Sequence, residues 1–169
     1  MPNQQYFPNR QSIRLRGFDY SSAGTYFITV CCHNREPWFG HIEQEQSVLN
    51  QYGIIVSNSW RELADRNRHI RLDEFIVMPD HFHGLIHIEN CENSRPIGRL
   101  VAAFKTVVCK SIRTNHQNPN IQIWQRNYWE HIVRSEIECN AVRRYIRNNP
   151  AKWRLYGRIA MRPAFMEIF

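Results

Sequence analysis

The stretch Met78-Pro79-Asp80-His81-Phe82-His83-Gly84-Leu85-Ile86-His87-Ile88 decides the fold, because its composition is typical of a β-strand entered from a tight turn at Pro79-Asp80. Side chains alternate between the two faces of a strand. His81 and His83 are therefore expected to point the same way, and Phe82 into the opposite layer. Two imidazoles on one face can bind one divalent metal ion. Taken alone, a His-x-His pair is more often a polar strand face that binds water or neighbouring groups.

A second signal lies near the end of the chain, in Tyr145-Ile146-Arg147-Asn148-Asn149. Tyr145 and Asn149 are four residues apart and share one face of a helix, which Pro150 is expected to end near Asn149. Taken singly, Tyr145 is typical of a half-buried aromatic and Asn149 of a C-terminal cap. Together with the histidine pair, they indicate a nucleophile beside a metal in a phosphate-binding cleft.

The composition predicts one domain over residues 1–169, with a basic arm over 1–20 and a basic tail over 150–169. Hydrophobic residues make up 43% of the chain and aromatic residues 12%, which argues against disorder. No apolar run is long enough to cross a bilayer, and the first residues lack the core of a signal peptide. Five cysteines without a Cys-x-x-Cys spacing fit a reducing compartment, so we expect a cytoplasmic protein without membrane contact.

The charge is divided unevenly along the chain. Residues 1–90 carry 8 Lys and Arg against 10 Asp and Glu, whereas residues 91–169 carry 14 against 5. A solvated basic surface is the simple interpretation, but an excess of this size in half of a small domain favours a nucleic-acid partner. Trp153 is interpreted as a hydrophobic plug that docks the tail. The residues expected to contact DNA are Arg10, Arg14, Arg16, Arg95, Arg99, Lys105, Lys110, Lys152 and Arg154.

The hydrophobic pattern predicts an α+β fold, with one antiparallel sheet and helices packed on one face. A Ser-x-x-Glu capping box at Ser135 marks the start of the last helix. Besides the histidine strand and the last helix, the expected elements are strands over 24–32, 72–78, 121–124 and 128–133 and helices over 48–65 and 99–113.

Four blocks of the chain resemble the single-tyrosine transposases of the HUH endonuclease superfamily, above all the REP-associated tyrosine transposases. The blocks are residues 14–20, 72–84, 124–132 and 144–150, and the similarity covers roughly residues 10–155. The resemblance implies a ferredoxin-like (RRM-like) fold of the HUH endonuclease type. It also implies a transposase that nicks and rejoins single-stranded DNA at palindromic, REP-like hairpins.

The same resemblance implies roles for individual residues. Tyr145 matches the catalytic tyrosine, which forms a 5′-phosphotyrosine, and His81 and His83 match the metal ligands. Asn149 falls where the family has a polar third ligand. The implied metal is Mg²⁺ or Mn²⁺, with Zn²⁺ as an alternative. We expect both histidines to be partly exposed.

Three questions stay open at this stage. The group that takes the tyrosine proton is one of them, with His131 and His87 as candidates. The oligomeric state, monomer or homodimer, is another. The third is the class of activity: the alternatives are a hairpin DNA- or RNA-binding protein of the same fold that does not cleave, and a zinc-dependent hydrolase with Asp80 as its base.

Overall fold

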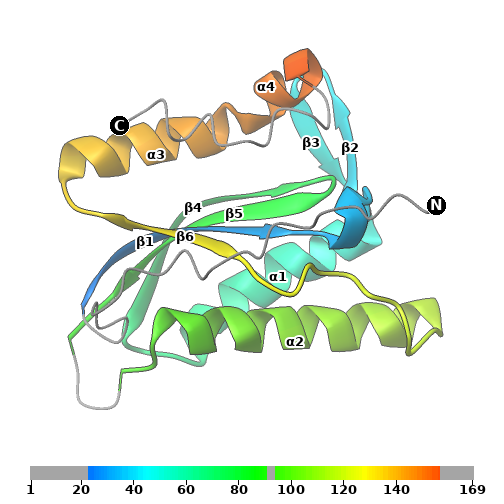
Figure 1. The fold of residues 1–169 in the computed structure, drawn as a ribbon, viewed down its shortest axis with the longest axis horizontal. Coiled ribbons are helices and arrows are strands. Elements are labelled where there is room, and N and C mark those ends of the chain that lie inside the picture. The colour runs from blue at the N-terminus through cyan, green and yellow to red at the C-terminus, as the bar shows by residue number, and fades with distance from the viewer. Residues whose placement is uncertain (1–22, 91–93, 157–169) are drawn as a thin grey trace, which may run out of the picture.

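The structure is a computed structural model that describes residues 23–90 and 94–156, with the backbone alone for residues 154–156. The predicted arm over 1–20 and residues 157–169 of the predicted tail lie outside the described residues. None of the described helices is long and apolar enough to cross a membrane. The elements are β1 (Gly24–Cys31), η1 (His33–Arg35), β2 (Gly40–Glu43), β3 (Gln46–Leu49), α1 (Gln51–Asp65), β4 (Ile70–Met78), β5 (His81–Ile88), α2 (Ile97–His116), β6 (Trp129–Val133), α3 (Glu136–Arg147) and α4 (Asn149–Tyr156) (Figure 1).

Four strands form one antiparallel sheet in the order β4-β5-β1-β6, and β2 pairs with β3 as a separate hairpin. β1 lies next to the histidine strand, with Cys31 opposite His81. The predicted strands are confirmed except for residues 121–124, where the backbone makes one isolated bridge, from Trp124 to Cys32. Ile123 and Trp124 are buried in the main core. Their apolar character therefore reflects burial and not strand pairing.

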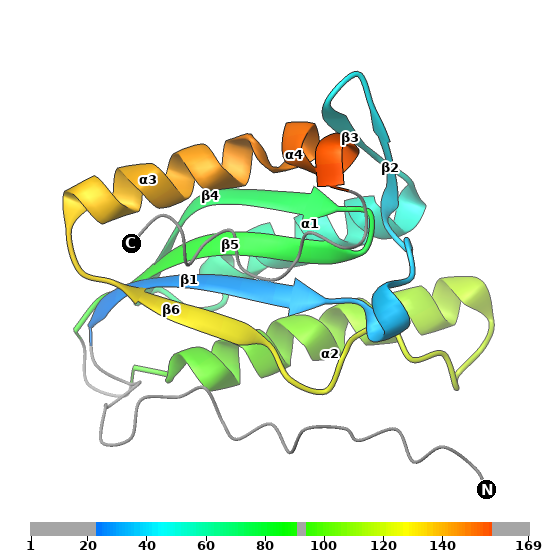
Figure 2. The same cartoon turned by 45° about the horizontal axis from the view of Figure 1, so that its top comes forward.

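Helices cover both faces of the sheet, so the fold class is confirmed but the placement of all helices on one face was wrong. α1 and α2 pack on one face, and α3 crosses the other (Figure 2). The reason lies in β1, which is apolar on both sides: Ile28 and Val30 join the core under α1 and α2, and Phe27 joins a smaller core under α3. A strand that is apolar on both sides needs cover on both sides.

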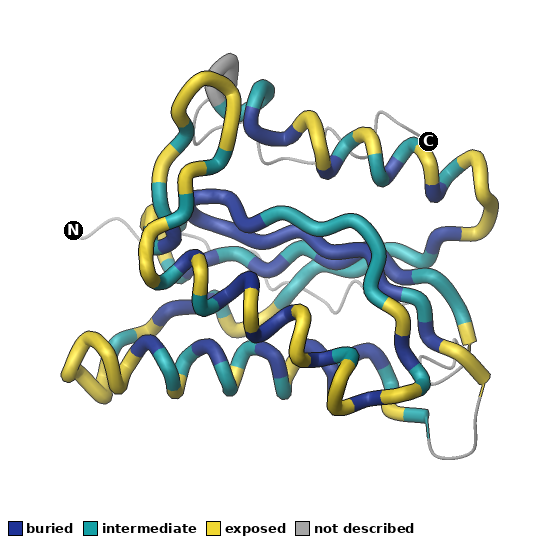
Figure 3. The backbone as a smooth tube through the Cα atoms, turned by 180° about the vertical axis from the view of Figure 1, so that it is seen from behind, coloured by how far each residue is buried: buried dark blue, intermediate teal, exposed yellow. Residues whose placement is uncertain are grey.

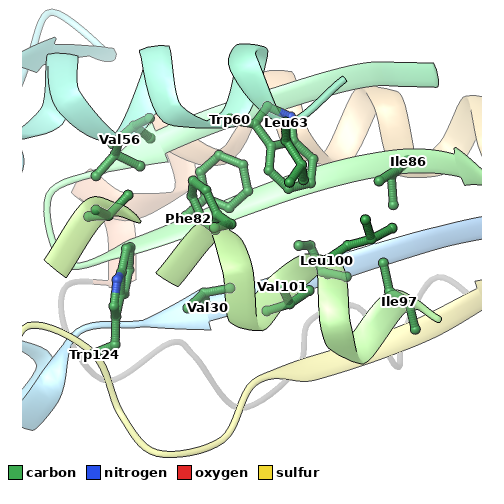
Figure 4. Packing of buried hydrophobic residues seen from close by; sticks show 14 of the residues in the cluster. Val30, Val56, Trp60, Leu63, Phe82, Ile86, Ile97, Leu100, Val101 and Trp124 are labelled. Atoms are coloured by element: carbon green, nitrogen blue, oxygen red, sulfur yellow. The ribbon is translucent and has the colours of Figure 1, made fainter. Parts of the chain in front are cut away.

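The main core lies between the sheet and the pair α1 and α2. Phe82 of β5 packs against Trp60 of α1, with ring centroids 4.8 Å apart (Figure 4). The ring of Phe104 on α2 lies 5.1 Å from that of Phe82. The residues of the central strands are mostly buried, whereas the outward turns of the helices are exposed (Figure 3). Phe82 therefore points away from α3, as the alternation along β5 predicts.

α1 begins later than the predicted helix over 48–65, because residues 46–49 form β3. Asn50 caps the helix, and its side-chain oxygen accepts two backbone N–H groups of the first turn. Gly53 is required in this first turn. A Cβ at Gly53 would lie 2.2 Å from the carbonyl oxygen of Phe39, so no larger residue fits without a shift of the backbone.

The boundary between α3 and α4 sets the geometry of the second sequence signal. Ser135 caps α3 as predicted, with its hydroxyl accepting the N–H of Glu138 at 3.1 Å. The chain leaves α3 at Asn148 and at once starts α4. Pro150 lies in the first turn of α4, where a missing N–H breaks no helical bond. The predicted end near Asn149 is confirmed, but a second short helix follows it.

Candidate active site

His81 and His83 lie on the face of β5 that α3 covers. Their ring centroids are 4.6 Å apart, and His83 stacks on Phe27 at 5.3 Å. The two histidines are 0% and 2% exposed, so the prediction that they are partly exposed was wrong. Their cover comes from later elements: the ring of Tyr145 on α3 lies 5.3 Å from His83, and that of Trp153 on α4 lies 5.6 Å from His81.

The hydrogen bonds of the two imidazoles leave one nitrogen of each ring for a ligand. Nδ1 of His81 lies 2.7 Å from Oδ1 of Asp80, and Nδ1 of His83 lies 2.8 Å from the hydroxyl of Thr29. Nε2 of His83 is buried and has no partner among the described residues. Burial lowers the pKa of both imidazoles well below 6.5, and the charge of Arg35 lowers it further. Both rings are therefore neutral at neutral pH, as a metal ligand must be.

Asn149 completes the set of candidate ligands. Its Oδ1 lies 3.3 Å from Nε2 of His81. Because Asp80 accepts the proton on Nδ1, Nε2 of the neutral ring is an acceptor that faces a second acceptor. A cation bound by both atoms relieves this contact, as does rotation of the amide to turn Nδ2 toward the ring. With Nε2 of His83, the site offers two nitrogen donors and one oxygen donor, a set that fits a divalent metal ion.

Tyr145 lies beside these ligands on α3. It is hydrogen-bonded to the side chain of Asn149 across the end of the helix. Its ring meets Phe27 edge-on at 5.9 Å, and Nζ of Lys152 lies 5.3 Å from the ring centroid. Burial raises the pKa of Tyr145 above 10, whereas the bond to Asn149 and the charge of Arg35 lower it. The hydroxyl is protonated at neutral pH and must lose its proton before it can act as a nucleophile.

Asp80 is part of the site in a role that the sequence did not indicate. Its side chain is 1% exposed; Oδ1 binds the imidazole of His81, and Oδ2 forms an ion pair with Nε of Arg35 at 2.9 Å. A carboxylate held in this way orients the histidine and fixes its tautomer. It is not open to a substrate water, so the geometry opposes the hydrolase interpretation with Asp80 as the base.

The structure assigns partners to the two histidines considered as proton acceptors. Nε2 of His87 lies 2.7 Å from Asp73, and its Nδ1 lies 2.8 Å from the hydroxyl of Thr25. Nε2 of His131 lies 2.6 Å from Glu138. Both nitrogens of His87 are therefore engaged, which removes it as a candidate proton acceptor, and these bonds do not decide the case of His131.

A second polar cluster, formed by Asp73, His87 and Cys139, lies farther along the same face. Their candidate ligand atoms lie within 4.8 Å of one another, a spacing that would suit a metal ion. However, Arg143 of α3 donates Nε and Nη2 to the two oxygens of Asp73, at 3.0 and 2.6 Å. A guanidinium on the carboxylate repels a cation. We therefore interpret this cluster as an anchor that ties α3 to the sheet.

Apart from His87, the anchor consists of residues to which the sequence assigned no role. Asp73 and Glu74 lie in an irregularity of β4, where the register with β5 shifts. Arg147 lies one turn after Arg143 on α3, and its Nε is 3.5 Å from Glu74. The sequence signal for this anchor was an acidic pair in a strand together with two arginines four residues apart on a helix. Each charge taken alone is indistinguishable from a solvated surface charge.

Replacing Asp73 with Asn should lower the free energy of unfolding by about 2 kcal/mol at pH 7, because Asp73 accepts charge-assisted bonds while largely buried. Arg143 holds the pKa of Asp73 well below 3.8. A lowered pKa in the folded state adds stability above the unfolded pKa, and this stability is lost as the pH falls. The difference between wild type and Asp73→Asn should therefore shrink below about pH 4 in urea denaturation.

The control for this measurement is Glu62→Gln, which removes an exposed pair with Arg66 and should change stability by less than about 0.5 kcal/mol. A stability difference for Asp73→Asn that is the same at pH 7 and pH 3 would contradict the anchor.

The predicted DNA-contacting residues are distributed over two faces. Lys152 lies beside Tyr145, whereas Arg95, Arg99, Lys105 and Lys110 lie on or just before α2, across the sheet from the site (Figure 2). Lys105 and Lys110 line a groove of about 770 Å³ between α2 and residues 117–126. The part of the chain that the structure describes does not include Arg10, Arg14, Arg16 or the side chain of Arg154.

An RRM-like antiparallel sheet that holds a His-x-His strand against a tyrosine-bearing helix is the arrangement that the resemblance to the single-tyrosine transposases implies. The family model described as "Transposase IS200 like" matches residues 21–149, and the chain belongs to this family.

Individual relatives agree with this assignment. An uncharacterised protein of Haemophilus influenzae is 38% identical over 164 residues, which cover 86% of this chain and 90% of the relative. A second protein of that organism, provisionally named a REP-associated tyrosine transposase, is 25% identical over 79% of this chain and 74% of its own length. The similarity to the REP-associated branch is thereby confirmed.

Solved structures agree with the fold. A REP-associated tyrosine transposase bound to a REP hairpin matches with a TM-score of 0.63 and 20% identity, over 84% of this chain and 74% of that one. A protein of Deinococcus radiodurans, provisionally described as a transposase, matches with a TM-score of 0.51 and 19% identity, over 80% of this chain and 95% of that one.

Proposed function

We propose that the protein is a metal-dependent transposase that nicks and rejoins single-stranded DNA at palindromic hairpins. The observation that carries the proposal is the convergence of Tyr145, His81, His83 and Asn149 at one buried point, although His81 and Asn149 are 68 residues apart in sequence. The relative solved with a REP hairpin supports a hairpin as the substrate class. A protein that only binds DNA has no need of this set of groups.

The proposed metal ligands are His81, His83 and Asn149, and their donor atoms suit Mg²⁺ or Mn²⁺ completed by water. A bound ion supplies a Lewis acid that offsets charge on a phosphate oxygen. Two observations support this fit: the buried Nε2 of His83 has no partner among the described residues, and Oδ1 of Asn149 faces the acceptor nitrogen of His81. Asp80 and Thr29 hold the two rings from behind.

The chemistry proposed for Tyr145 conserves the phosphodiester bond energy. The phenolic oxygen loses its proton and attacks the scissile phosphorus, and the bond from phosphorus to the 3′ oxygen of the preceding nucleotide breaks. That oxygen takes a proton and leaves as a 3′-hydroxyl, while the 5′ phosphate stays on Tyr145. A second 3′-hydroxyl reverses the step, which joins new strands and frees the tyrosine without ATP.

The test of this function is the covalent intermediate. The protein is incubated with Mn²⁺ and a pool of single-stranded hairpins that carry randomised flanks and a fluorescent 3′ label, because the fragment 3′ of the nick stays on the protein. We expect a labelled protein band on a denaturing gel, absent with EDTA and with a duplex pool. Tight hairpin binding without such a band would instead identify a non-cleaving DNA-binding protein.

Hairpin binding should depend steeply on salt, because arginine and lysine displace counterions from the phosphates. For single strands, the slope of log K against log salt concentration is expected to be roughly −0.7 for each neutralised phosphate. Fluorescence anisotropy between 50 and 300 mM KCl, roughly the range in which such slopes are resolved, measures it. An affinity independent of salt, or a preference for plain duplex of equal length, would contradict a phosphate-binding surface.

A further inference from the structure

Arg35 lies next to the candidate site in an unusual backbone conformation. It ends η1, just after β1, and both Asn34 and Arg35 have positive φ angles, of 51° and 58°. This left-handed conformation is uncommon for residues other than glycine and costs free energy. Such strained positions cluster at functional sites, where the surrounding structure holds them.

The contacts of Arg35 tie it to the histidine strand. Its Nε forms an ion pair with Oδ2 of Asp80 at 2.9 Å, and its Nη1 donates to Sγ of Cys31 at 2.9 Å. Asp80 binds His81 through its other oxygen, and Cys31 lies opposite His81 in the sheet. The guanidinium is therefore held from two sides at the end of β5 where the candidate metal ligands lie.

One donor of this guanidinium is unused. Nη2 of Arg35 is buried and has no partner among the described residues, although the side chain as a whole keeps 19% of its surface exposed. A buried donor without an acceptor costs free energy, and such a group in a native fold calls for an explanation. A phosphate oxygen is the acceptor that a guanidinium binds most strongly.

The charge of Arg35 also acts on the reacting groups. It lowers the pKa of His81, of His83 and of Tyr145, which places one positive charge within electrostatic reach of both proposed metal ligands and of the nucleophile. The pairing with Asp80 orients the guanidinium but does not use its third nitrogen. The pairing with Asp80 therefore does not explain why Nη2 is buried without an acceptor in the described part of the chain.

We propose that Arg35 is a further catalytic residue, which binds a non-bridging oxygen of the scissile phosphate and stabilises the charge that builds up as Tyr145 attacks. This inference rests on the proposed strand-transfer function and adds a second positive group to it. Arg35 donates through Nη2, and Asp80 and Cys31 keep the guanidinium in place during the reaction. Preorganised donors of this kind act on the transition state more than on substrate binding.

The experiment compares single-turnover cleavage by wild type, Arg35→Gln and Arg35→Lys, with Arg66→Gln, at the exposed C-cap of α1, as the control. Each protein receives the hairpin with either a normal or an uncharged methylphosphonate linkage at the scissile position. We expect Arg35→Gln to cleave the normal substrate about 10²–10³-fold more slowly, the usual loss for one transition-state donor. Hairpin affinity and the thermal shift on adding Mn²⁺ should be unchanged.

The methylphosphonate arm distinguishes a phosphate contact from a structural role. The rate penalty of Arg35→Gln should largely disappear with the uncharged linkage, because the charge that Arg35 stabilises is then missing. Arg35→Lys keeps the pairing with Asp80 but lacks the guanidinium fork, so it should fold and cleave at an intermediate rate.

The inference is overturned by wild-type cleavage rates in Arg35→Gln and Arg35→Lys, by an equal penalty on both substrates, or by loss of the Mn²⁺ shift. The last result would mean that Arg35 acts only through Asp80 on the histidines. In all three cases the wild type still cleaves, so the proposed function stands. A wild type that binds the hairpin but never cleaves it overturns both.

Discussion

Tyr145→Phe should abolish cleavage and the covalent protein–DNA band while the fold and hairpin affinity survive. The substitution keeps the ring, and with it the contacts to Phe27 and His83 at 5.9 and 5.3 Å. It removes the hydroxyl that bonds to Asn149, which should lower the free energy of unfolding by about 1 kcal/mol. Denaturing gels measure the covalent band, and thermal denaturation measures the fold.

Tyr128→Phe is the matched control, because Tyr128 is the aromatic in the same half of the chain most easily taken for the nucleophile. Its hydroxyl donates to Oε2 of Glu130 at 2.5 Å. This variant should lose about as much stability as Tyr145→Phe and keep full cleavage. A Tyr145→Phe protein that still forms the covalent band would show that another residue is the nucleophile.

Removal of either histidine should eliminate both metal binding and cleavage. Wild type is expected to gain about 2.7 kcal/mol of stability when Mn²⁺ is present at 100 times its Kd, because the ion binds only the folded protein. His81→Ala and His83→Gln should lose this gain. Because both side chains are buried, each variant should also be less stable than wild type without metal, by about 1–3 kcal/mol.

His87→Gln is the control, since His87 lies on the same face of β5 but binds Asp73 and Thr25. It should lose some stability and keep the full Mn²⁺ shift. Differential scanning fluorimetry with and without Mn²⁺ measures both quantities for all three variants. A His81→Ala protein that retains the shift would remove His81 from the metal site, and loss of the shift in His87→Gln would move the site toward the Asp73 cluster.

Much of the fold is predictable from local pattern. Two-residue alternation in β5 separates Phe82 from the two histidines, and Ser135 marks the start of α3 through a bond to Glu138 that local sequence specifies. The pattern fails where apolar character has two explanations. The apolar pattern at Ile123 and Trp124 predicted a strand. These residues are apolar because they are buried, and burial in a loop requires no strand partner.

The site shows the same division between chemistry and environment. The sequence by itself determined the candidate reactive groups, since the His-x-His spacing and the four-residue spacing from Tyr145 to Asn149 are local properties of a strand and a helix end. It also predicted that Pro150 interrupts the helix at this point. These predictions need no knowledge of what packs against the two elements.

Only the tertiary structure decided what surrounds those groups. The burial of His81 and His83 comes from α3 and α4, which lie more than fifty residues later in the chain. The contacts of Arg35 with Asp80, and of Arg143 with Asp73, likewise join distant segments. Burial, pKa and charge pairing are sums over neighbours in space, and a sequence pattern reports only neighbours along the chain.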